Sequence, residues 1–482
     1  MKPVRCGGLM ASLARTALLI ASGCAPGVLA PRSAPSQAPT GAPVADVAAP
    51  PAREVDPPAE TEGDVTVASV RGMPIIVERV AGAEFCAIEL VIRGGVRNWS
   101  ADRAGIEDVA LAAAAGGGTR SLSKEKLARK LASLGATLAT RTRADFSAVI
   151  GVAPTASFDD SFGIVADIVL APAMPETEIA LARSRALSDR RHELEDGDGL
   201  LGMLERRAVF ANHPYAARPE GTIETLSALT PDAISAHLAK LRETSRMLLV
   251  VVGDLDAAHV IGRARAAFAQ TPRGLYVDTP IPPLEFGASQ VMGDAHPLAT
   301  NYIGSFFAAP AWRDADHVAV RLAIDVLSHR VWEEVRSKRN LSYAPWAVFR
   351  WWYASPYAGF YVSTLDPNTT MTVMMAEARR IQTDLVAQDE LAGQKAVLRT
   401  RCEQSRESSV DEASLLADGQ LYAGDWRFAR RYCDAIGRVS AEQIRAAARK
   451  YMTAWRTVIV GDPSKLDPKT VHATSAQPEG PQ

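Results

Sequence analysis

The chain has 482 residues, of which 47% are hydrophobic and 22% are charged, and its formal net charge at pH 7 is −2. This composition is that of a globular protein, and the length allows about two to four domains. The charge is near neutral and Lys and Arg are scattered, which argues against a nucleic-acid-binding surface. The sequence has no zinc-finger spacing, no GxxxxGKS/T loop and no GxSxG elbow, which excludes those three kinds of site.

Residues 1–23 have the pattern of an export signal. The segment MKPVRCGGLMASLARTALLIASGC begins with basic residues and continues with an apolar run too short for a stable membrane-spanning helix. Its end, IASGC, resembles a bacterial lipoprotein box. We expect lipidation of Cys24 and a membrane-anchored lipoprotein of the bacterial envelope that faces the periplasm. The alternative is a soluble secreted protein cleaved after Ala30.

Residues 24–63 are rich in Pro, Ala and Ser and have few large apolar side chains. Such a segment cannot bury a core, so we predict a disordered tether. After a lipid anchor, a tether of this kind would hold a folded domain away from the membrane surface.

The cysteines that follow the predicted tether are Cys86, Cys402 and Cys433. They are too few for a disulfide scaffold. Cys402 and Cys433 both lie on predicted helices and could pair, but buried free thiols account for them equally well.

The segment AGIEDVALAAAAGGGT, residues 104–119, predicts an Ala-rich helix that the three glycines close. Glu107 and Asp108 fall in its first turn, where the helix dipole favours acidic side chains. Further along the chain, hydrophobic periodicity predicts strands at 85–95, 144–154 and 301–310, and helices at 123–135, 316–338 and 370–388. This mixture predicts an α+β fold with helices packed on largely antiparallel sheets.

Two segments of the chain repeat one pattern. Residues 229–256 and 439–466 each begin with a hydroxyl cap (Thr230 or Ser440), continue as an amphipathic helix and enter an apolar strand that ends in Gly-Asp. We therefore predict two homologous halves. The predicted boundaries are 64–271 for the first half, 272–288 for a linker, 289–466 for the second half and 467–482 for a tail.

Four segments now resemble landmarks of the pitrilysin/insulinase metallopeptidase family, in the order of that family. They are RAGIEDVALAAAAGGGTRSLSKEKLARKLASLGA, HPYAARPEGTIETLSALT, LLVVVGDLD and VWEEVRSKRNLSYA. The resemblance covers about residues 65–466. It implies two α+β halves that enclose a peptide-binding chamber, and a common arrangement in which one subunit carries zinc and a similar partner does not.

In active members of that family, a His-x-x-Glu-His helix binds zinc and activates water. The corresponding positions here fall at or near Asp108, Leu111 and Ala112, and the chain has no histidine before His192. Asp189 takes the place of the third ligand, a glutamate. Carboxylates suit a hard cation, but we favour a structural role for them and expect no metal and no cofactor in this chain.

The second half retains a different family feature. Arg336 and Tyr343 stand seven residues apart in RSKRNLSY, the spacing of an Arg and a Tyr that reach substrate beside the zinc in the family. We expect Arg336 near a helix end, a left-handed break at Asn340 and a strand that begins with Leu341 to Tyr343. The alternative is a surface arginine and a tyrosine packed in the next strand. The resemblance also matches His213, for which we expect a role in local loop structure.

These observations predict a non-catalytic, zinc-less subunit of a pitrilysin/insulinase-type zinc metallopeptidase. It would bind peptide or unfolded protein and supply Arg336 and Tyr343 to a homologous partner subunit that holds the His-x-x-Glu-His site, with zinc only in that partner. The alternative is a peptide-binding or scaffolding envelope lipoprotein without enzymatic activity. A self-sufficient hydrolase with an unfamiliar site has no support in the sequence.

Overall fold

The computed structural model describes residues 56–350 and 353–472. The predicted signal segment, Cys24 and most of the predicted tether lie outside these residues. These described residues form one compact unit. Within the described ranges, no helix combines the length and the apolar character needed to cross a membrane.

The first sheet has seven strands in the order β1-β2-β3-β7-β4-β6-β5, and only β3 and β7 pair in parallel. The strands are β1 Glu60–Glu62, β2 Val65–Val70, β3 Met73–Arg79, β4 Phe85–Arg93, β5 Thr137–Thr142, β6 Phe146–Pro154 and β7 Met247–Gly253. The helices of this part are α1 Ile106–Gly117, α2 Lys124–Leu134, α3 Phe158–Leu170, α4 Glu176–Glu193, α5 Gly197–Val209, α6 Ile223–Ala228, α7 Pro231–Lys240 and α8 Ala257–Ala267.

The second sheet has five strands in the order β10-β11-β9-β12-β8, and only β8 and β12 pair in parallel. The strands are β8 Gln290–Ala295, β9 Asn301–Ala308, β10 Trp346–Arg350, β11 Tyr357–Thr364 and β12 Arg456–Gly461. The helices are α9 His317–Val331, α10 Pro367–Thr383, α11 Gln388–Gln404, α12 Ser409–Asp418, α13 Arg427–Arg438, α14 Ala441–Tyr451 and α15 Pro468–His472, with π-helical turns at Trp332–Ser337 and Gly419–Ala423.

The strand order repeats between the two sheets. The order β3-β7-β4-β6-β5 in the first sheet corresponds to β8-β12-β9-β11-β10 in the second, with the parallel pair at the same place. Local signals also match: Ser440 and Gln443 form the predicted capping box, and Gly253 and Gly461 end β7 and β12. The predicted α+β fold with two homologous halves and largely antiparallel sheets is confirmed, and both sheets are open.

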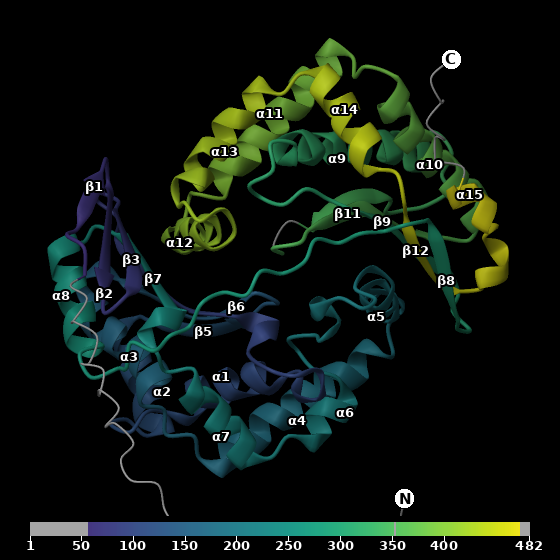
Figure 1. The fold of residues 1–482 in the computed structure, drawn as a ribbon. Coiled ribbons are helices and arrows are strands. Elements are labelled where there is room, and N and C mark those ends of the chain that lie inside the picture. Colours follow the sequence, from purple (N-terminus) through teal and green to yellow (C-terminus); the bar gives the residue numbers. More distant parts are fainter. Residues whose placement is uncertain (1–55, 351–352, 473–482) are drawn as a thin grey trace, which may run out of the picture. The chain divides into compact units, whose positions relative to one another are not determined.

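Each sheet is covered on one face by a helix from the other half of the chain (Figure 1). Helix α12 packs on β4 and β7, and helix α5 packs on β12 and β9. Alternate residues of β7 therefore enter different hydrophobic clusters: Leu249 and Val251 pack beneath α1 and α3, while Val250 packs with α12. Burial on both faces explains why β7 reads as a continuous apolar run rather than an alternating one.

Regular structure begins inside the segment that was predicted to be a disordered tether. Glu60–Glu62 form strand β1 and pair with β2, so the predicted end of disorder at residue 63 is wrong. The cause lies nearby: Asp56 accepts hydrogen bonds from the backbone of Arg71 and Gly72, and from the Ser69 hydroxyl at 2.9 Å. These bonds hold the incoming chain at the β2–β3 turn.

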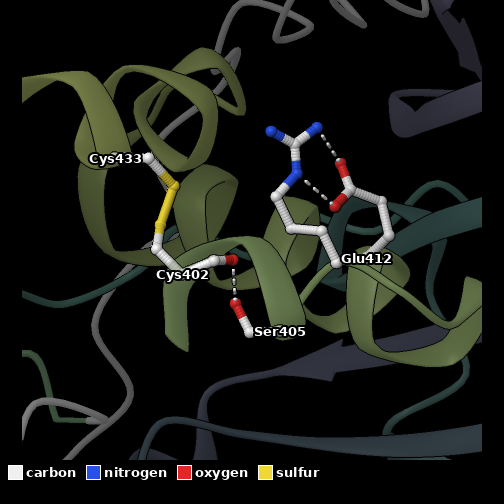
Figure 2. Close-up of a disulfide and its surroundings, with 5 residues drawn as sticks. Cys402, Ser405, Glu412 and Cys433 are labelled. Carbon is white, nitrogen blue, oxygen red and sulfur yellow. Dashed lines mark hydrogen bonds and ion pairs between the residues drawn. A yellow bond between two sulfur atoms is a disulfide. The ribbon is translucent and has the colours of Figure 1, made fainter. Parts of the chain in front are cut away.

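A disulfide joins α11 to α13 (Figure 2). It links Cys402 and Cys433, which resolves the alternative that the sequence left open. Cys86 is a buried free thiol, and burial raises its pKa to about 11. Beside the disulfide, Arg406 pairs with Glu412 at 2.9 Å.

Candidate functional site

Helix α1 forms where the Ala-rich segment predicts it. It begins after Gly105 and ends before Gly118, both of which adopt positive φ. Gly117 is still helical, and a Cβ at this position would lie 2.9 Å from the Pro175 side chain. Only glycine therefore allows the end of α1 to approach the segment that enters α4.

Glu107 in the first turn of α1 is fully buried and fully engaged. Its carboxylate accepts hydrogen bonds from Ser147 Oγ (2.6 Å), Asn98 Nδ2 (3.0 Å) and His237 Nε2 (3.1 Å). Three donors from three separate elements account for a buried carboxylate without a cation. The geometry thus supports the structural role that the sequence favoured for Glu107.

The two aspartates matched to zinc-ligand positions come together in the structure. Asp108 on α1 and Asp189 on α4 lie on packed helices. Burial raises the pKa of Asp108 to about 6, and the negative charges of Glu220 and Asp189 act in the same direction. Leu111 is buried and Ala112 is exposed, and neither hydrocarbon side chain has an atom that could bind a metal.

The charge of Arg190 opposes the rise in the pKa of Asp108, and the neighbouring Glu193 has arginine partners. Arg190 bonds Glu193 at 2.8 Å, and Arg218 makes two bonds to the same carboxylate, at 3.0 and 3.1 Å. Over residues 56–350 and 353–472, no group of three or more His, Cys, Asp or Glu side chains could hold a metal ion. We therefore expect the charged side chains around Asp108 to neutralise one another rather than to activate a water molecule.

The structure places Arg336 and Tyr343 side by side. Arg336 Nη1 donates to the Tyr343 carbonyl oxygen, and the guanidinium carbon lies 4.0 Å from the Tyr343 ring centroid and 4.7 Å from that of Trp332. Asn340 has φ 52°, the predicted left-handed break. This residue reverses the chain between the π-helical turn and Tyr343, which brings the two side chains together.

The prediction that Leu341 to Tyr343 begin a strand is wrong, because β10 begins at Trp346. Side chains occupy the backbone carbonyl oxygens that would otherwise accept hydrogen bonds from a neighbouring strand. Thr364 Oγ1 donates to the Leu341 carbonyl, and Arg336 donates to the Tyr343 carbonyl. Pro345 has no amide hydrogen to donate to a neighbouring strand. Tyr343 is consequently 79% exposed, which also rules out a tyrosine packed within a strand.

Sequence reasoning missed two further groups around this pair. Trp332 contacts the Arg336 guanidinium and belongs to the same helical segment. The spacing of four residues between an aromatic and a basic side chain could have predicted this cation–π contact from the sequence. Thr300, which directly precedes β9, and Ser363 of β11 line the neighbouring cleft. No local pattern links these distant residues to Arg336.

His213 serves a loop, as expected from its place in the HPYA segment. Its Nδ1 accepts from the Tyr215 amide and its Nε2 lies 2.9 Å from the Pro282 carbonyl oxygen. Burial lowers the pKa of His213. The ring ties the turn before Tyr215 to the segment that joins the two sheets.

Comparison with known proteins addresses the family and the fold of the chain. Residues 228–398 match the family model described as Peptidase M16 inactive domain. An uncharacterized zinc protease of Mycobacterium leprae is 22% identical over 316 residues, which cover 60% of this chain and 67% of the relative. Cytochrome b-c1 complex subunit 1, mitochondrial, of Rattus norvegicus is 22% identical over 217 residues, which cover 44% of this chain and 45% of the relative.

A solved structure supports the fold. The crystal structure of a peptidase M16 inactive domain from Pseudomonas fluorescens superposes with a TM-score of 0.74 at 18% identity and covers 84% of this chain and 99% of its own. The resemblance to the pitrilysin/insulinase family is confirmed. Residues 228–398 are therefore similar to the inactive domain of M16 peptidases, and the rat relative is by its name a subunit of a complex.

Proposed function

We propose that this chain is the non-catalytic, zinc-less subunit of a zinc metallopeptidase, and that it binds peptide and supplies Arg336 and Tyr343 to a homologous partner. One observation carries the proposal: the positions matched to zinc ligands hold Asp108, Leu111 and Ala112, while Arg336 and the exposed Tyr343 lie side by side. A chain that has lost one half of a site and kept the other is suited to complete a site on a second subunit.

The chemistry of the two side chains fits that role. A guanidinium held between two rings presents fixed donors to a peptide oxygen at little entropic cost. The Tyr343 phenol is exposed and can donate to the oxyanion that develops when water attacks a peptide carbonyl. The partner would hold the zinc and the water in its His-x-x-Glu-His site, and this chain would carry no zinc.

We further propose that the protein is an exported lipoprotein anchored through Cys24 and facing the periplasm. The disulfide between Cys402 and Cys433 supports export, because such bonds persist in oxidising compartments and are rare in the reducing cytosol. The rat relative is by its name a subunit of a complex, which agrees with a subunit role for this chain. Co-purification from native membranes, followed by mass spectrometry, would identify the partner.

Steady-state kinetics of the reconstituted pair test the proposal. Tyr343→Phe should lower kcat by about 10²–10³, the usual cost of losing one oxyanion donor. Arg336→Ala should raise KM more than it lowers kcat, because a contact made equally before and during reaction contributes to binding alone.

Tyr451→Phe and Arg339→Ala are matched controls, since they remove a phenol hydroxyl on α14 and an exposed guanidinium near Arg336. Both should leave kcat and KM unchanged. If Tyr343→Phe and Arg336→Ala assemble normally and cleave like the wild type, the proposal is wrong, and a scaffolding or peptide-binding lipoprotein without activity becomes the better account.

A further inference from the structure

Arg336 and Tyr343 stand at the edge of a surface cleft of about 550 Å³. Besides these two residues, the cleft is lined by five hydroxyl side chains and one amide: Thr300, Ser337, Ser342, Ser363, Thr364 and Asn340. Leu341 and Leu365 complete the lining, so none of the lining residues is acidic. The cleft therefore combines one fixed positive charge with a wall of hydrogen-bonding groups.

The Arg336 guanidinium is oriented but not neutralised. Its Nη1 is engaged by the Tyr343 carbonyl, and its faces lie against Trp332 and Tyr343. Within the described residues, Arg336 has no ion-pair partner. The neighbouring cations differ, because Lys338 and Arg339 both pair with Glu334.

One hydroxyl group of the cleft remains available as a donor. Ser342 Oγ accepts the Ala344 amide at 3.2 Å, which leaves its hydroxyl hydrogen free to donate. Thr364, by contrast, already donates to the Leu341 carbonyl. A ligand in the cleft would therefore meet a guanidinium and at least one hydroxyl donor without an opposing carboxylate among the lining residues.

We infer that this cleft binds a carboxylate of the peptide, either its C-terminal group or an Asp or Glu side chain. The inference rests on the proposed function and specifies which substrates the Arg336 site selects. A planar carboxylate accepts two parallel bonds from a guanidinium, and such charge-assisted pairs are stronger than bonds to a neutral carbonyl. An anionic group would also provide the counter-charge that Arg336 lacks among the described residues.

Two pairs of synthetic peptides test the inference by calorimetric titration of the full chain. The first pair shares one sequence and differs only in a free or amidated C-terminus. The second pair is amidated and differs only in Asp or Asn at one internal position. We expect the charged member of one pair to bind about tenfold to a hundredfold tighter than its neutral match, and the pair that responds identifies the source of the carboxylate.

Variants connect the preference to Arg336. Arg336→Gln should abolish the difference within the responding pair, and Arg336→Lys should keep only part of it, because an ammonium retains charge without the planar fork. Lys338→Gln is the matched control, since its ammonium already pairs with Glu334 at 2.6 Å, and it should preserve the difference.

Three results would overturn the inference. These are equal binding within both pairs, no binding of any of the four peptides, and a preference that persists in Arg336→Gln. If Arg336→Gln instead weakens charged and neutral peptides equally, a carbonyl contact at this residue stands and the carboxylate assignment alone fails. The kinetics of the reconstituted pair judge the proposed function separately.

Discussion

Helix α12 meets the seven-stranded sheet through an apolar cluster and through charged groups that include the buried Glu89 and Asp418. Helix α5 meets the five-stranded sheet mainly through apolar side chains and phenol hydroxyls. On the α12 side, Arg141 bridges to the fully buried Glu89, which also accepts from Ser414 of α12 at 2.9 Å. Asp418 at the end of the same helix pairs with Arg143 at 3.5 Å.

The α5 side uses different contacts. Leu201 and Leu204 pack in the cluster that includes Phe306 of β9. Tyr357 donates its hydroxyl to Glu205 of α5 at 2.6 Å, while the Arg350 guanidinium stands farther off at 3.7 Å. One architecture therefore occurs twice with two kinds of interface, and the exchange of helices between sheets does not depend on a particular chemistry.

Among variants of the two interfaces, we expect Arg141→Met to cause the largest loss of unfolding free energy. The change leaves the carboxylate of Glu89 buried without a cation, which typically costs about 3–5 kcal/mol of unfolding free energy. Urea denaturation of the full chain at pH 7 measures it. Adding Glu89→Gln should restore part of the loss, and a loss below about 1 kcal/mol for the single variant would show that the α12 interface is not organised by this pair.

A smaller loss is expected on the α5 side from Tyr357→Phe. Removing the hydroxyl deprives buried Glu205 of its 2.6 Å donor, and such a loss costs about 1–3 kcal/mol. Tyr361→Phe is the matched control, because the Tyr361 hydroxyl bonds Asp198 at an exposed site, and it should cost less. Equal losses in the two variants would mean that burial of Glu205 is not the deciding factor.

The smallest change in unfolding free energy at neutral pH is expected from Asp418→Asn. The amide removes the cost of ionising a buried carboxyl and also removes the pairing with Arg143, and these two effects oppose each other. Burial raises the pKa of Asp418 to about 6 from an ordinary value of 3.8. The folded state then binds more protons than the unfolded state between these values, so this group lowers stability as pH rises through that window.

Asp418→Asn should therefore flatten the fall in stability between about pH 4 and pH 6, measured as urea midpoints at several pH values. Burial also raises the pKa of Glu205, so Glu205→Gln is the companion variant on the α5 side. Comparing how stability changes with pH in the two variants shows how much of the pH dependence each interface contributes. An unchanged slope in Asp418→Asn would place that response elsewhere.

Local signals predicted much of the fold. Capping residues such as Thr230 and Ser440 begin α7 and α14 as expected, and the Gly-Asp pairs mark the ends of β7 and β12. The site was predicted in part: Asn340 breaks the helix and brings Arg336 to Tyr343. These features depend on neighbours in sequence, and a single chain contains that information.

The remaining features depend on partners far along the chain. The leucines of α5 predict an apolar face but not the sheet that it covers, because β12 lies some 250 residues away. The apolar run of β7 was a usable sign of a sheet covered on both faces. The strand predicted at Leu341 failed for the same reason, since Thr364 lies in β11 and takes the Leu341 carbonyl.

The exchange of helices also bears on the order in which the chain is made. Helix α5 is synthesised long before β12, the last strand among the described residues, and the first sheet stays uncovered on one face until α12 has been made. Contacts of such long sequence separation form slowly, and here they cannot close until almost the whole chain has emerged. For a protein that we propose to be exported, late closure would keep the nascent chain unfolded enough to pass through a secretion channel.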